Sequence, residues 1–242
     1  MSRLTILKIS FRSAGVENVI YPVIISDGNE FILIDCGYPA CLPILQQAAT
    51  DNGIDLSQLT KVIITHHDFD HMGALAGLKR TYPNSKVLAS AQEERYISGK
   101  QKSLRLEQAE AIYDTLPEDR KQAAKQFQRV LEEVETAEVD QTLNDGDIFP
   151  WCGGIEIIAT PGHMPGHISI YHIESKTLIA GDALVAENGE LAIANPQYTI
   201  DMMGAKKSIK KLLDYEIDTL ICYHGGIVTR EIKAALQKIS TD

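Results

Sequence analysis

Histidine and aspartate gather in one short stretch of the chain. Three histidines and two aspartates lie within six consecutive positions, His66 to His71, in the sequence T-H-H-D-F-D-H-M-G. Imidazole and carboxylate groups bind divalent cations and can leave some coordination positions open for exchange. The stretch directly follows the apolar run 62–64, which predicts a buried strand. Taken alone, it also fits a polar turn that happens to be rich in histidine.

Three later residues of the same types also follow predicted strands. They are His163 in T-P-G-H, Asp182 in A-G-D-A and His224 in Y-H-G-G. Each lies beside glycine, which allows tight turns and close approach of the backbone. Side chains at four strand ends can converge on one edge of a sheet, a common place for sites in α/β folds. The sequence therefore predicts a metal site assembled from four separate segments.

The elements that must position these residues alternate between strands and helices. Apolar runs predict strands before about residue 90 and again from about residue 155, and the turn 27–29 predicts a hairpin. Helices are expected at 39–49, 202–213 and 230–239. Strand clusters alternating with helices indicate an α/β layered fold.

A charged region from about residue 90 to residue 135 interrupts this pattern. Ser90-Ala91-Gln92-Glu93 has the spacing of a capping box, which opens a helix. Pro117 separates an expected helix at 104–116 from a second one with apolar residues at helical spacing. Two readings can hold together, a solvated helical pair with one buried stripe and a cap that roofs a substrate cleft.

Composition and charge limit the classes of protein to which this chain can belong. Residues 1–242 are predicted to form a single domain with a helical insertion at about 90–135, and the hydrophobic content of 44% is ordinary for a globular protein. The net charge of −10 argues against nucleic acid, and the sequence shows neither a signal peptide nor a membrane span. Four scattered cysteines fit free thiols in a reducing cytoplasm. The expected partner is a small-molecule substrate, and a homodimer is left open.

The motifs and their order resemble the metallo-β-lactamase superfamily of metallohydrolases, whose first motif is H-x-H-x-D-H, followed by a distant His, Asp and His. The matching residues are His66, Asp70, His71, His163, Asp182 and His224. The resemblance implies a four-layer αββα sandwich with two divalent metal ions, zinc first and manganese or iron as alternatives. It assigns the first ion to His66, Asp68 and His163, the second to Asp70, His71 and His224, and the bridging position to Asp182.

One position departs from the family motif, because Asp68 stands where the second histidine is usual. Asp68 is the favoured ligand. A register in which His67 replaces it is the alternative, although adjacent side chains usually point in different directions. A weakened first metal site is the third reading. An extra negative charge should make the bound water less acidic and shift preference from zinc toward harder ions.

The resemblance implies hydrolysis of an ester-like bond, a lactone or a thioester, by a metal-bridging hydroxide. Asp70 would be catalytic, Tyr198 would contact the substrate, and His167 would support the loop of His163, whereas His172 is expected to be structural. Lactone- and thioester-hydrolysing members are the most similar in size. An iron-dependent redox enzyme of the same fold, reducing oxygen like flavodiiron proteins or oxidising persulfides, is the alternative, and a non-catalytic metal-binding module is a third class.

Overall fold

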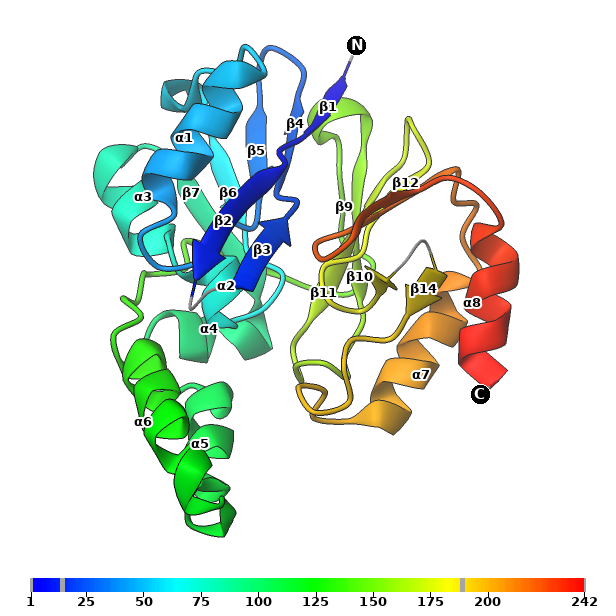
Figure 1. Ribbon diagram of the computed structural model, residues 1–242. Coiled ribbons are helices and arrows are strands. Elements are labelled where there is room, and N and C mark those ends of the chain that lie inside the picture. Colours follow the sequence, from blue (N-terminus) through cyan, green and yellow to red (C-terminus); the bar gives the residue numbers. More distant parts are fainter. Residues whose placement is uncertain (1, 14–15, 188–189, 242) are drawn as a thin grey trace.

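Two six-stranded sheets packed face to face form the centre of the molecule, and helices cover both outer faces (Figure 1). The structure is a computed structural model that describes residues 2–13, 16–187 and 190–241. The arrangement is a four-layer αββα sandwich, which confirms the predicted fold class.

The first sheet has the strand order β1-β4-β5-β6-β7-β8, and its last four strands run parallel. Its strands are β1 (Arg3–Ile6), β4 (Val23–Ser26), β5 (Phe31–Ile34), β6 (Lys61–Ile63), β7 (Lys86–Ser90) and β8 (Gln141–Leu143). The predicted hairpin is present as the antiparallel pair β4 and β5. Parallel strands end at the same edge, so the residues that follow β6 and β7 lie near each other.

The second sheet has the order β16-β15-β12-β11-β10-β9. Its strands are β9 (Ile148–Phe149), β10 (Ile155–Ala159), β11 (Ile168–His172), β12 (Thr177–Ile179), β15 (Thr219–Cys222) and β16 (Gly226–Val228). Two small hairpins flank the sandwich, β2 (Ile9–Ser13) with β3 (Val16–Ile20) and β13 (Val185–Glu187) with β14 (Glu190–Ala192). The backbone amide of Ile168 donates to the Thr65 carbonyl oxygen at 3.1 Å, which joins the two sheets at one edge.

Three apolar clusters fill the three spaces between the four layers. The middle cluster packs one sheet on the other and includes Ile34, Ile63, Ile157 and Ile170, all of them inaccessible or nearly so. The outer clusters pack the first sheet on α1 (Leu42–Asp51) and α3 (Leu75–Thr81), and the second on α7 (Met202–Leu212) and α8 (Ile232–Thr241). Strands buried on both faces are apolar at nearly every position, which is why they stand out in the sequence as continuous runs.

The charged region folds as three helices, α4 (Ala91–Ile97), α5 (Leu104–Ala111) and α6 (Glu118–Glu132). Ser90 caps α4 by accepting from the Glu93 amide, as the capping-box spacing predicted. The helix expected over 104–116 ends at Ala111 and continues as a short 3₁₀ turn. The α5–α6 pair projects away from the sandwich (Figure 1). None of the helices in the described ranges is long and apolar enough to cross a bilayer.

Gly225 offers a test of how tightly the edge of the second sheet is built. Its φ is +101°, and a Cβ there would lie 1.9 Å from the Ala186 carbonyl oxygen. Gly53 is a matched control, because its φ is +71° and nothing lies within 4 Å of the added atom. Both alanine variants strain the backbone, but only Gly225→Ala adds a steric overlap. We expect Gly225→Ala to lower the free energy of unfolding by about 1–3 kcal/mol more than Gly53→Ala in urea titrations; equal losses would contradict this packing.

Candidate metal centre

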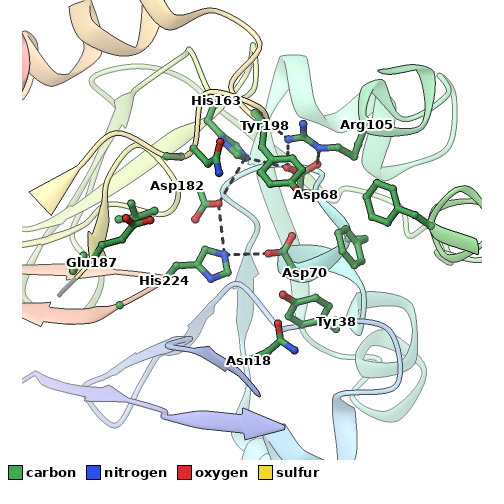
Figure 2. Close-up of a pocket in the computed structure, with 17 residues that line it drawn as sticks. Asn18, Tyr38, Asp68, Asp70, Arg105, His163, Asp182, Glu187, Tyr198 and His224 are labelled. Atoms are coloured by element: carbon green, nitrogen blue, oxygen red, sulfur yellow. Dashed lines mark hydrogen bonds and ion pairs between the residues drawn. The ribbon is translucent and has the colours of Figure 1, made fainter. Parts of the chain in front are cut away.

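Seven side chains with metal-binding atoms meet at the edge where the two sheets join, and we call them the ligand cluster. They are His66, Asp68, Asp70, His71, His163, Asp182 and His224. They form three overlapping groups whose ligand atoms lie within 4.8 Å of one another: His66, Asp68 and His163; His66, His71 and Asp182; Asp70, His71 and His224. The structure thus brings together every residue that was predicted as a metal ligand. Figure 2 shows five of them around one cleft.

The local backbone explains how one short stretch supplies ligands to both halves of the cluster. After β6 the chain bends at Thr65 and reaches Asp68, whose own backbone is extended and which precedes the single-turn helix α2 (Phe69–Met72). Asp70 and His71 lie within that turn, so they project in different directions from Asp68. Asp68 Oδ2 lies 3.0 Å from His163 Nε2 and 3.5 Å from His66 Nε2. Asp70 Oδ2 lies 3.1 Å from His224 Nε2.

Asp182 lies between the two halves. Its Oδ1 is 3.4 Å from His71 Nε2, and its Oδ2 is 3.6 Å from His224 Nε2 and 3.7 Å from His163 Nε2. This is the position expected of a bridging carboxylate. Burial opposes ionisation, but the neighbouring imidazoles, those of His224 and His71 first, hold the pKa of Asp182 well below its usual range. The residue is therefore a carboxylate at neutral pH.

Four buried atoms of the cluster lack a hydrogen-bond partner within the described chain: His66 Nε2, His71 Nε2, Asp182 Oδ1 and His163 Nδ1. Unpartnered polar atoms are uncommon in folded interiors because each costs free energy. The first three of these atoms belong to residues whose ligand atoms lie within 4.8 Å of one another. Imidazole nitrogens and carboxylate oxygens are also the ligands that zinc accepts, so the residues present fit divalent cations.

Asp35 orients two of the histidines, although it was not among the predicted site residues. It accepts hydrogen bonds from His71 Nδ1 at 2.8 Å and from the Thr65 hydroxyl at 2.8 Å. Because that hydroxyl donates to Asp35, it accepts from His66 Nδ1, 3.0 Å away. Both Nδ1 atoms are then protonated, and both Nε2 lone pairs face the cluster. One carboxylate fixes two tautomers, as outer partners of metal-binding histidines commonly do.

His67 is turned away from the cluster and held by Glu93. The Glu93 carboxylate, which is fully buried, accepts from the His67 backbone amide at 2.9 Å and contacts the ring at Nδ1. The ring stacks on Tyr96, and its Nε2 accepts from the Leu104 amide. Both ring nitrogens are therefore engaged elsewhere. The structure places Asp68 at the cluster and His67 outside it.

His167 lies beneath Asp182 rather than beside the cleft. Its Nε2 accepts from the Asp182 backbone amide at 3.0 Å, and its Nδ1 therefore donates to the Thr160 hydroxyl at 2.8 Å. Burial, together with the neighbouring His163, lowers the pKa of His167 to about 3. The neutral His167 ring supports the backbone that carries Asp182. The His167 backbone carbonyl accepts from the Thr160 amide. His172, by contrast, lies far along β11 and contacts Ser175 and the Cys152 carbonyl.

The cleft above the cluster has a volume of about 430 Å³ and an aromatic wall (Figure 2). Tyr38, Phe69, Phe127 and Tyr198 line it. Tyr198, predicted to contact substrate, lies at the rim with 44% of its surface exposed. Phe127 comes from α6, so the insertion does contribute to the cleft. Phe127 is one of the apolar residues at helical spacing in the insertion, but spacing along one helix does not show which surface those residues contact.

Comparison with known proteins agrees with this geometry. The model of the metallo-beta-lactamase superfamily matches residues 17–224. The probable metallo-hydrolase YflN of Bacillus subtilis (strain 168) is 28% identical over 87% of this chain and 81% of its own length. A hydroxyacylglutathione hydrolase of Ectopseudomonas mendocina (strain ymp) is 28% identical over 57% of this chain and 38% of its own length. The fold is shared with a metallo-beta-lactamase family protein of Thermus thermophilus, at a TM-score of 0.75 and 19% identity over 98% of this chain and 78% of that one.

The chain belongs to the metallo-beta-lactamase superfamily, and it is an enzyme of the metallohydrolase class. The resemblance that the motifs indicated is thereby confirmed.

Glu93 provides a stability test of the loops that carry the cluster. Its carboxylate also accepts from the Gly166 amide at 2.8 Å, so it ties the His67 loop to the loop after β10. Glu93→Ala leaves several buried donors without a partner, and we expect it to cost about 3–5 kcal/mol of unfolding free energy. Glu94→Ala, which removes only the surface pair with Lys100, should cost less than about 1 kcal/mol. Urea titration of both variants measures the difference, and similar losses would refute this role for Glu93.

Proposed function

We propose that the protein hydrolyses a lactone or a thioester with an apolar acyl part, using two divalent cations held by the ligand cluster. The observation that carries the proposal is the position of the cluster, whose free ligand atoms lie directly beneath an aromatic cleft. Zinc is the first candidate for both ions, because four imidazoles and three carboxylates are ligands that zinc accepts. The substrate is then a small molecule that enters the cleft.

When bound, two such cations supply a hydroxide nucleophile near neutral pH and polarise the substrate carbonyl. The protein's own groups then orient the substrate and carry protons. Asp70 is the candidate for proton transfer, because its carboxylate borders the cleft and lies 3.1 Å from His224 Nε2. From this position it can receive a proton from the nucleophile and pass it to the leaving group. Tyr198, at the rim, would hold the part of the substrate that projects outward.

The charge of the lining supports an uncharged substrate. Among the described residues that line the cleft, Arg105 is the one lysine or arginine, and it is bonded to Asp68. Glu187 adds a further negative charge to the lining. A substrate with carboxylate groups, such as a glutathione thioester, would therefore lack a counter-charge outside the metal centre. This favours a lactone or a simple acyl thioester over the substrate named for the hydroxyacylglutathione hydrolase relatives.

The test is metal analysis of protein purified without added metal, followed by assays on lactones and thioesters with short and long acyl groups. Two equivalents of zinc or manganese and turnover of an uncharged ester support the proposal. Iron together with oxygen consumption would overturn it in favour of the redox reaction of the same fold. A protein that binds no metal would overturn both.

Removal of the metal should abolish turnover. Dialysis against a chelator, or the substitution Asp182→Asn, should lower kcat/KM by at least about 100-fold, because both take away stabilisation of the nucleophile and the developing oxyanion. Adding zinc back should restore the dialysed protein but not the variant. Asp51→Asn, an exposed position on α1, is the control and should keep full activity. Turnover that survives complete metal removal would contradict the mechanism.

The aromatic wall should act mainly on substrate binding. Phe127 meets Phe69 edge to face with ring centroids 5.7 Å apart, and both line the cleft. Phe127→Ala should raise KM for long-acyl substrates by about 10-fold, since burying such a ring contributes about 1.5–3 kcal/mol, and should leave kcat nearly unchanged. Ile112→Ala is the matched control, because Ile112 is on the same insertion and is 49% exposed. Equal effects of Phe127→Ala on short and long substrates would argue against an acyl-binding role.

A further inference from the structure

Asp68 is held through both of its carboxylate oxygens by a residue of the insertion. Arg105, on α5, donates from Nε to Asp68 Oδ1 at 3.1 Å and from Nη2 to Oδ2 at 2.6 Å (Figure 2). This is a two-point contact between a guanidinium and a carboxylate, the geometry that fixes a carboxylate most firmly. The side chains are only 5% and 6% exposed.

Arg105 is itself immobilised, so it is not available to bind a substrate anion. Its Nη1 donates to Gln108 Oε1 at 2.8 Å, and its Nη2 also donates to the Tyr198 carbonyl at 2.9 Å. Its guanidinium carbon lies 5.4 Å from the centre of the Tyr198 ring. With these contacts made, the Arg105 guanidinium acts on Asp68 and not on a substrate.

The pair changes the charge at the first metal position. Asp68 alone would add a negative charge that the histidine of the usual motif does not have. Arg105 brings one positive charge to the same carboxylate, so the pair is neutral, as a neutral imidazole is. Asp68 Oδ2 nevertheless still faces His66 Nε2 and His163 Nε2 at 3.5 and 3.0 Å. A ligand oxygen is thus offered without a change in the net charge of the centre.

We propose that Asp68 and Arg105 act together as a replacement for the second histidine of the motif. Asp68 supplies the ligand atom, and Arg105 is a positioning residue that fixes the carboxylate and cancels its charge. The first metal position should then keep the zinc preference of a histidine-rich centre. The pair also makes metal binding depend on the docking of α5, which links the insertion to the metal centre.

The inference rests on the metal centre of the proposed function and not on the identity of the substrate. Its test therefore measures metal binding, and negative substrate assays would leave it intact. If the unaltered protein bound no second metal ion, the proposed function itself would fail, which is a distinguishable result.

The experiment compares Asp68→His, Arg105→Met and the double variant with the unaltered protein. Zinc affinity is measured by titrating metal-free protein against a chromophoric chelator, and stoichiometry by elemental analysis. Asp68→His alone should lower the affinity for the second zinc ion by about 10- to 100-fold, because the buried Arg105 guanidinium then lacks its partner and faces two cations. In the Arg105→Met background the same substitution should restore binding to within about twofold of the unaltered protein.

This rescue of zinc binding by Arg105→Met would not arise if Arg105 merely packed α5 against the site. Equal weakening by Asp68→His in both backgrounds would overturn the proposal, and so would unchanged zinc binding in the single variant. Arg95→Met is the control for charge, since Arg95 is exposed on α4, and it should leave zinc binding unchanged.

A second comparison applies if Asp68→His does not fold, as judged by circular dichroism. Arg105→Lys keeps the positive charge and should keep the zinc-to-manganese preference of the unaltered protein. Arg105→Met leaves Asp68 negative and should shift that preference toward manganese by about 10-fold. The same preference in all three proteins would overturn the charge-cancelling role.

Discussion

Seven ionisable groups concentrated at one edge of a sandwich are the constraint on which this structure depends. Three carboxylates and four imidazoles meet there, most of them buried. Buried charges are costly unless they are paired, hydrogen-bonded or bound to metal. The inward-facing atoms are of the types that divalent cations bind. The surrounding protein holds the outer side of the cluster, through Asp35 behind His71 and through the His167 ring, which accepts from the Asp182 backbone amide.

The helical insertion also contributes side chains to this edge of the sandwich. Each of its three helices places one side chain at the site: Glu93 from α4 behind the His67 loop, Arg105 from α5 on Asp68, and Phe127 from α6 in the wall of the cleft. The two descriptions that the sequence allowed for this region, a solvated pair and a cap over a cleft, are therefore both apt. Most of α6 faces solvent, yet Phe127 still reaches the cleft.

Much of the fold and of the ligand cluster was open to prediction from the sequence. Strands buried on two faces must be apolar throughout, so they appear as runs such as 62–64, and parallel strands bring their ends to one edge. Residues that follow such runs, like His163 and His224, can therefore be expected to converge. Boundaries were less predictable. The helix expected from residue 39 begins at Leu42, and the strand expected from the run 62–64 ends at Ile63, because hydrogen bonding and not hydropathy ends an element.

The sequence by itself determined the class of fold, the superfamily and the ligand types, because these follow from local patterns and from spacing along the chain. Only the tertiary structure decided between Asp68 and His67, and it did so through contacts with distant residues. Glu93 and Arg105 lie 26 and 37 positions further along the chain. One buried carboxylate turns His67 away, and one buried guanidinium neutralises Asp68. No local pattern marks either contact, because the group that each residue binds comes near only when the insertion folds onto the sheets.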